Sequence, residues 1–86
     1  MNETLLIAAE ECAEVTQMLS KVLRFGLHAQ HPNEDVDNQD RLEEEIGDLM
    51  CMFEIMAEQN IIDWGKVSVH SRYKRDKLRQ WSKIEL

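Results

Sequence analysis

Apolar side chains recur every three or four residues over three long stretches of this 86-residue chain. Such spacing gathers apolar residues on one side of an α-helix, whereas a β-strand would need apolar and polar residues to alternate, and no stretch of useful length does so. The expected helices span about Glu3–Phe25, Asn38–Gln59 and Trp64–Lys83. The sequence therefore predicts an all-α protein with a three-helix protomer.

Residues that favour helix ends flank the three stretches. Asn2 and Asp63 precede the first and third helices, where their side chains can accept hydrogen bonds from the first free backbone N–H groups. Gly26 follows the first helix, at a position where the backbone often has a positive φ. Asp40 and Glu43 have the spacing of a capping box, so the second helix could begin two residues later than expected. The polar segment between the first two helices is predicted to be a loop.

The composition favours a single domain, residues 1–86, in the cytoplasm. With 43% hydrophobic and 31% charged residues the chain is too polar for a membrane protein, and acidic residues stand where a signal peptide would need a basic flank. Cys12 and Cys51 lie within apolar helical patterns and are expected to be buried free thiols. A chain of this size buries only about 60% of its unfolded surface, which favours an oligomer.

Charge is distributed unevenly along the chain, which carries a net charge of −7. An acidic protein lacks the positive surface that nonspecific nucleic-acid binding requires, so nucleic acid is not an expected partner. Residues 1–62 hold fourteen acidic and three basic residues, whereas residues 63–86 hold three acidic and seven basic residues. This division suits a site that binds both a cation and an anion, although an acidic helix pairing with a basic one would produce it too.

Four carboxylates are expected on the apolar sides of the first two helices. At about 100° per residue, Glu11 and Glu14 fall within the apolar sector of the first helix, and Glu45 and Asp48 within that of the second. Glu54 points the other way, toward solvent. Unpaired carboxylates gathered in an apolar setting are costly, so a bound cation is expected. Mg²⁺ prefers oxygen ligands and commonly bridges carboxylates to phosphates.

Other metals fit the sequence less well. No glutamate is followed by a histidine three residues later, as the ligand pattern of di-iron bundles requires, and this also disfavours a redox function. Cys12 and Cys51 are far apart in the sequence. His28 and His31 have a spacing that could hold a metal, but they lie in a loop without a second ligand cluster, so zinc is not expected.

Two segments resemble the signature of a known enzyme family. The sequences EECAEV (residues 10–15) and EEEIGDLM (residues 43–50) are similar to the ExxE and ExxD halves of the motif in MazG-like all-α nucleoside triphosphate pyrophosphohydrolases. The resemblance covers nearly the whole chain, including a basic third helix (SRYKRDKLRQW) like that of short, often phage-encoded members.

The resemblance implies a fold, an activity and a set of site residues. It implies a helical-bundle oligomer, a homodimer or homotetramer, that hydrolyses a (deoxy)nucleoside triphosphate to the monophosphate and pyrophosphate. A water molecule would attack the α-phosphorus with the help of Mg²⁺, for which Mn²⁺ can substitute. The residues that would bind the metal and carry out catalysis are Glu11, Glu14, Glu45 and Asp48.

Candidate phosphate ligands follow from the same helical geometry. Lys21 lies two turns after Glu14 on the same side of the first helix, and Lys74 and Lys77 share one side of the third. The alternative for these lysines is that their stems pack along apolar surface while the ammonium groups stay in water. Stacking on a base and packing in a core remain alternatives for three aromatic residues: Phe25, Trp64 and Trp81.

The main alternative function is that of a non-catalytic acidic module that binds another protein, for instance by imitating the charge of DNA. Three amphipathic helices and a net charge of −7 would suffice for such a module. Its acidic residues would then lie mainly on solvent-facing sides. The expected inward placement of Glu11, Glu14, Glu45 and Asp48 favours the enzyme.

Overall fold

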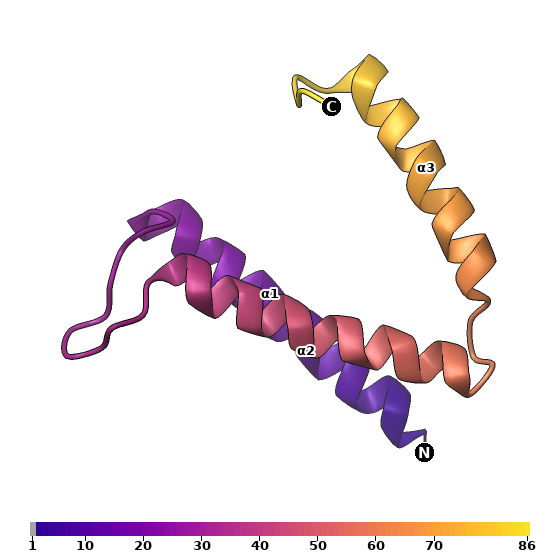
Figure 1. The fold of residues 1–86 in the computed structure, drawn as a ribbon, viewed down its shortest axis with the longest axis horizontal. Coiled ribbons are helices and arrows are strands. Elements are labelled where there is room, and N and C mark those ends of the chain that lie inside the picture. Colours follow the sequence, from indigo (N-terminus) through magenta and orange to yellow (C-terminus); the bar gives the residue numbers. More distant parts are fainter. Residues whose placement is uncertain (1) are drawn as a thin grey trace. The chain divides into compact units, whose positions relative to one another are not determined.

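The structure, a computed structural model, describes residues 2–86 and contains three α-helices in this range. These are α1 (Glu3–Phe25), α2 (Asn38–Glu58) and α3 (Trp64–Trp81) (Figure 1). The described residues form no strand apart from an isolated bridge between Gln30 and Asp37. The prediction of an all-α protein is therefore confirmed. No helix in the described range is both long and apolar enough to cross a membrane.

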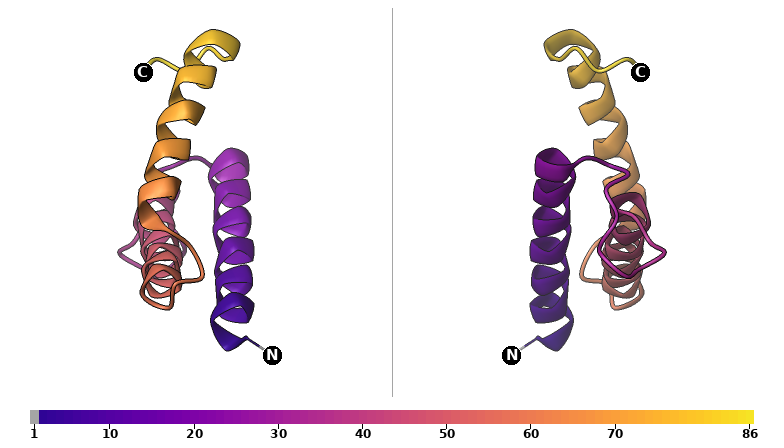
Figure 2. Two further views of the ribbon diagram at one scale, coloured as in Figure 1. Left: turned by 90° about the vertical axis from the view of Figure 1, so that its right-hand side faces the viewer. Right: turned by 90° about the vertical axis from the view of Figure 1, so that its left-hand side faces the viewer.

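The chain divides into two compact units, residues 1–56 and 57–86. In the first unit α1 and α2 run side by side in opposite directions and form a helical hairpin, as the views in Figures 1 and 2 agree. The second unit consists mainly of α3. A left-handed residue, Asn60 with φ 59°, follows the end of α2.

Local capping explains where α1 and α3 begin and where α1 ends. The side chain of Asn2 accepts a hydrogen bond from the backbone N–H of Leu5 at 3.2 Å, and that of Asp63 accepts one from Lys66 at 3.1 Å. Gly26 ends α1 with φ 101°, a conformation that other residues rarely adopt. These three predictions from the sequence are confirmed.

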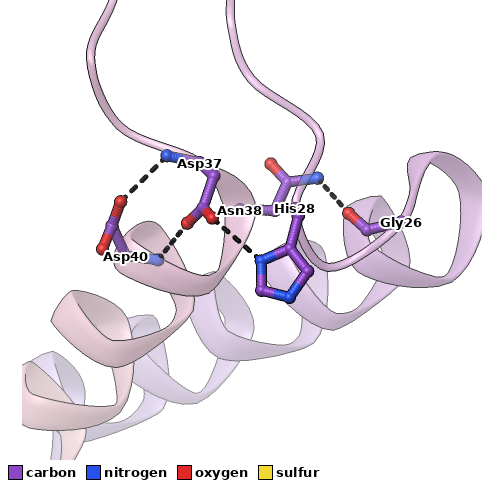
Figure 3. Close-up of polar contacts among 5 residues, drawn as sticks. All are labelled: Gly26, His28, Asp37, Asn38 and Asp40. Atoms are coloured by element: carbon purple, nitrogen blue, oxygen red, sulfur yellow. Dashed lines mark hydrogen bonds and ion pairs between the residues drawn. The ribbon is translucent and has the colours of Figure 1, made fainter.

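The start of α2 agrees with the expected helix, which begins at about Asn38, and not with the alternative start two residues later. Asp37 and Asp40 form a reciprocal capping box, in which each carboxylate accepts a hydrogen bond from the other's backbone N–H at 3.0 Å (Figure 3). The spacing of Asp40 and Glu43 therefore does not mark the cap, because α2 begins earlier, at Asn38. His28 lies against the same cap, with its Nδ1 3.0 Å from the Asp37 carboxylate. The backbone hydrogen bond from Asp40, followed by the contact with His28, lowers the pKa of Asp37.

The cap also joins the loop to both helices. The side-chain amide of Asn38, which is buried, donates a hydrogen bond to the carbonyl of Gly26 at 3.0 Å (Figure 3). The backbone N–H groups of Asn38 and Gln39 donate to carbonyls of Ala29 and Leu27. These bonds close the hairpin at its loop end and thereby fix how α1 and α2 are aligned.

We expect Asp37→Ala to lower the free energy of unfolding by about 1–2 kcal/mol, since the substitution removes an N-cap and the partner of His28. Asp35→Ala is a matched control, because Asp35 is exposed in the same loop and removes the same charge. Urea unfolding followed by circular dichroism measures both variants. Equal losses would show that the capping box does not stabilise the hairpin.

The hairpin is held together by a narrow row of covered side chains on each helix. Ala8, Met18 and Met52 are the buried hydrophobic residues of the described chain. The covered positions follow one another at intervals of three or four residues, as in a coiled-coil seam. On α1 they include Ala8, Glu11, Val15, Met18 and Val22, and on α2 they include Asn38, Leu42, Glu45, Leu49, Met52 and Met56.

The antiparallel arrangement gives the hairpin two different long sides. Each residue of a helix is turned by about 100° about the helix axis from the residue before it. Because α1 and α2 face each other and run in opposite directions, the residues one place after the covered positions lie on the same side of the hairpin in both helices. This side carries Leu5, Cys12 and Leu19 of α1 and Ile46, Met50 and Phe53 of α2, together with Glu43, which follows the covered Leu42. Because most of these residues are apolar, we call it the apolar side. Residues one place before the covered positions lie on the opposite side, which we call the acidic side. They include Glu14, Lys21, Arg41, Glu44, Asp48 and Cys51.

Candidate functional site

Three of the four predicted carboxylates meet in the hairpin. Glu11 of α1 and Glu45 and Asp48 of α2 each offer a carboxylate oxygen that lies within 4.8 Å of those of the other two. Glu11 and Glu45 are half-buried and Asp48 is exposed. Two segments more than thirty residues apart in sequence thus place acidic groups at one point. We call these three residues the acidic cluster.

The acids are brought together by the same spacing that forms the core. Glu11 takes a covered position between Ala8 and Val15, and Glu45 takes one between Leu42 and Leu49. Both glutamates are therefore held at the contact between the helices. Asp48 lies one turn after Glu45, at the border between this contact and the acidic side. The acidic cluster consequently opens toward the acidic side of the hairpin.

Glu14 occupies the matching position on α1, one turn after Glu11. It is exposed and lies outside the group of oxygen atoms within 4.8 Å. Its charge nevertheless acts on the cluster: burial raises the pKa of Glu45, and the next largest causes of the increase are the charges of Glu14 and Asp48. Glu11 and Glu44 contribute in the same direction. The structure thus groups three of the predicted acids closely and places the fourth within electrostatic reach.

The acidic cluster takes part in no ion pair within the part of the chain that the structure describes. The ion pairs among residues 2–86 lie elsewhere and join Asp37 to His28, Glu34 to Arg41, and Asp76 to Arg79. Several carboxylates held at one point without a counter-ion repel one another, which favours protonation or the binding of a cation. Clustered carboxylate oxygens are the ligands that Mg²⁺ prefers. The donor set therefore fits a hard divalent cation.

Comparisons with known proteins identify no relative. No family model, no curated protein and no solved structure matches the chain. The chemistry of the site must therefore be argued from its own residues.

Two basic residues lie on the acidic side, nearer the loop end of the hairpin than the acidic cluster. Lys21 follows Glu14 by seven residues, or two turns, as expected from the sequence. Arg41 precedes Glu45 by one turn and Asp48 by two, so the three share one side of α2. Arg41 pairs with Glu34, and its Nε is buried without a hydrogen-bond partner. Arg41 was not among the residues expected at the site. Its position one turn before Glu45 is the feature of the sequence that could have indicated it.

Lys74 and Lys77 lie on α3, in the second compact unit. Both are exposed. Lys74 borders a cavity of about 230 Å³ within this unit, together with Ser71, Arg75, Leu78 and Leu86. A basic and partly apolar surface therefore surrounds Lys74, whereas the role of both lysines at the acidic cluster stays a prediction from the sequence.

The aromatic residues and the cysteines are more exposed than expected. Phe25, Trp64 and Trp81 are 64%, 46% and 84% exposed, so none of them packs in a core of the described chain. Phe25 is contacted by the guanidinium of Arg24, 4.9 Å from its ring centre, and it lines a cavity of about 260 Å³ with loop residues 29–32. The prediction that Cys12 and Cys51 are buried is wrong: both are free and exposed, because they lie beside the covered rows and not within them.

Proposed function

We propose that this protein is a magnesium-dependent nucleoside triphosphate pyrophosphohydrolase of the MazG-like kind. The observation that carries the proposal is the convergence of Glu11, Glu45 and Asp48, with carboxylate oxygens within 4.8 Å of one another and no ion-pair partner among residues 2–86. These residues, together with Glu14, belong to the two motifs on which the resemblance rests. Half-burial of Glu11 and Glu45 also argues against a module whose acids serve only as a charged surface.

The proposed reaction divides tasks among the candidate site residues. Glu11, Glu14, Glu45 and Asp48 would hold one or more Mg²⁺ ions, which supply Lewis-acid stabilisation of phosphate charge and lower the pKa of bound water. Lys21, Lys74 and Lys77 would bind the phosphates. The oxygen of water forms a bond to the α-phosphorus while the bond between the α-phosphorus and the oxygen that bridges it to the β-phosphorus breaks. The products released are the monophosphate and pyrophosphate.

One carboxylate must accept the proton that the attacking water loses. In the metal-free protein, burial and the neighbouring acids raise the pKa of Glu45, and a cation bound by these acids would lower it again. We further propose that the protein acts as a homodimer or homotetramer in the cytoplasm, with Mn²⁺ able to replace Mg²⁺. The small number of buried hydrophobic residues supports an oligomer, since so small a core is unlike that of a stable monomer.

Identification of the products tests the proposal. The purified protein, incubated with each of the common dNTPs and NTPs and Mg²⁺, should release the monophosphate and pyrophosphate from at least one of them, and EDTA should abolish the reaction. Phosphorus NMR distinguishes these products from a diphosphate and orthophosphate. Release of orthophosphate, or no turnover of any nucleotide with Mg²⁺ or Mn²⁺, would contradict the proposed function.

We expect Lys77→Ala to raise KM for the nucleotide about tenfold or more, because it removes a charge-assisted contact to phosphate. Lys83→Ala is the matched control, since Lys83 is an exposed lysine that follows α3. Circular dichroism checks that both variants remain folded. Identical kinetics for the two variants would assign Lys77 to the surface and leave the phosphates to other residues.

A further inference from the structure

A cavity of about 260 Å³ lies at the loop end of the hairpin, within the first compact unit. Its walls come from the end of α1, the loop and the start of α2, and they consist of Phe25, Ala29, Gln30, His31, Pro32 and Asn38. An apolar cavity of about 150 Å³ is enough to bind benzene. The cavity at the loop end, which we call the loop cavity, is therefore large enough for a planar ligand of one or two rings.

The walls of the loop cavity suit a nucleobase. Phe25 is 64% exposed even with the guanidinium of Arg24 4.9 Å from its ring centre, so the ring is available for stacking. Gln30 and His31 can donate and accept hydrogen bonds. The lining residues include no lysine or arginine, so a phosphate group would find no permanent positive charge among them. A base, by contrast, stacks through its faces and forms hydrogen bonds through its edges. We propose that the loop cavity binds the base of the nucleotide whose phosphates bind at the acidic cluster.

Phe25 places the loop cavity on the acidic side of the hairpin, toward which the acidic cluster opens. It follows Lys21 by four residues and Glu14 by eleven, and both spacings keep the three residues on one side of α1. Asn38 is about 10 Å from Glu45 along α2, and Phe25 is about 16 Å from Glu14 along α1. A base, a sugar, an α-phosphate and a metal ion in line bridge a gap of this length. A nucleotide with its base in the loop cavity therefore brings its α-phosphorus to the acidic cluster.

Two basic residues lie between the loop cavity and the acidic cluster. Lys21 lies one turn before Phe25 on α1, and Arg41 lies one turn after Asn38 on α2. Arg41 is held beside the loop by its ion pair with Glu34. A nucleotide bound along the acidic side thus meets these cations where its phosphate chain begins. The order of uncharged cavity, basic residues and carboxylates matches the order of base, phosphate and metal ion.

The walls of the loop cavity are held by hydrogen bonds of the hairpin itself. The buried side chain of Asn38 donates a hydrogen bond to the carbonyl of Gly26 at 3.0 Å (Figure 3). The backbone N–H of Asn38 donates to the carbonyl of Ala29, also at 3.0 Å, and Gln30 forms a bridge with Asp37. A site whose walls are already in place loses less conformational entropy when a ligand binds.

The inference rests on the proposed function, because it assigns the base of the same substrate, so its first test needs no turnover. We expect at least one of the common deoxynucleosides, at millimolar concentration in EDTA, to shift the ring NMR signals of Phe25 and His31. The signals of Phe53, on the apolar side, and of His28, which contacts Asp37, should shift less. Nucleosides carry no phosphate, so these shifts report base binding without metal or hydrolysis.

The second test is kinetic. Phe25→Ala should raise KM for the preferred nucleotide about 5- to 150-fold, because stacking of a base on an aromatic side chain is worth about 1–3 kcal/mol. Phe25→Tyr keeps the ring and should remain close to wild type. Leu23→Ala is the control for loss of an exposed apolar side chain, since Leu23 is 86% exposed two residues earlier, and its KM should not change. Circular dichroism confirms that the variants are helical.

Inhibition by inorganic tripolyphosphate, at fixed free Mg²⁺, separates base binding from general support of the site. Tripolyphosphate has no base, so its inhibition constant should be the same for wild type and Phe25→Ala. If Phe25 only maintained the structure of the site, the inhibition constant would rise together with KM for the nucleotide.

Failure of the inference and failure of the proposed function give different results. If the protein hydrolyses a nucleotide but Phe25→Ala leaves KM unchanged, or raises the inhibition constant of tripolyphosphate as much as KM, the inference is overturned and the proposed function stands. If no nucleotide is hydrolysed, the proposed function fails and the nucleoside spectra decide. Shifts at Phe25 and His31 would then uphold the loop cavity as a base site, and their absence would overturn it. The same spectra decide if Phe25→Ala does not fold.

Discussion

Glu45→Gln is expected to lower kcat by roughly a hundredfold or more. The substitution keeps the size of the side chain but removes the charge that lies at the centre of the acidic cluster, within 4.8 Å of carboxylate oxygens of Glu11 and Asp48. Metal ions contribute several kcal/mol to stabilisation of a phosphoryl-transfer transition state, and a loss of about 3 kcal/mol corresponds to a hundredfold slower reaction. Steady-state kinetics with saturating Mg²⁺ measure the effect.

Glu54→Gln is the control for this prediction. Glu54 lies on the same helix and undergoes the same chemical change, but it is exposed and points away from α1. Its kcat should stay within about twofold of wild type. Glu45→Gln should also be no less stable than wild type, because it removes a carboxylate whose pKa is raised by burial and by its acidic neighbours. Similar losses of kcat in both variants would mean that position in the hairpin does not matter.

Much of the fold could be predicted because helix boundaries depend on local interactions. The cap residues Asn2 and Asp63 and the positive φ of Gly26 act within one turn, so the sequence places the ends of α1 and the start of α3 correctly. The expected start of α2 at Asn38 is also correct, and Asp37 and Asp40, three residues apart, cap it locally. Asp40 and Glu43 have the same spacing as Asp37 and Asp40, so spacing alone could not tell which pair forms the capping box.

The candidate site could be predicted only in part, because the sequence does not fix which side of α1 packs against α2. The apolar sector of α1 is broad and contains more than one row of residues along the helix. The periodicity of the sequence does not tell which of these rows faces α2. The structure selects the row of Ala8, Glu11 and Met18 and leaves Leu5 and Leu19 exposed. Glu11 is therefore half-buried whereas Glu14 is exposed.

The second large effect expected is the response of stability to metal. Gathering carboxylates in the hairpin brings together like charges that the unfolded chain keeps apart, so the metal-free protein should be the less stable form. A ligand that binds only the native state stabilises it by RT ln(1 + [L]/Kd), or about 2.7 kcal/mol at a concentration of 100 Kd. For a chain of this length the melting temperature should rise on the order of 10 °C.

Asp48→Asn should separate metal binding from general salt effects. The substitution removes one ligand of the acidic cluster and one repulsive charge, so the metal-free variant should be as stable as wild type or more so. Its shift with Mg²⁺ should be much smaller. Asp35→Asn, which removes a charge from an exposed loop position, should keep the full shift. Protein concentration must be equal in all samples, because assembly also changes the melting temperature.

The thermal melt of wild type and Asp48→Asn, each in EDTA and in excess Mg²⁺ at constant ionic strength, tests the central claim most directly. If the acidic cluster binds a cation, Mg²⁺ should raise the melting temperature of wild type on the order of 10 °C and change that of Asp48→Asn little. No metal-dependent shift in wild type, or the full shift in Asp48→Asn, would contradict the claim that these acids bind a divalent cation.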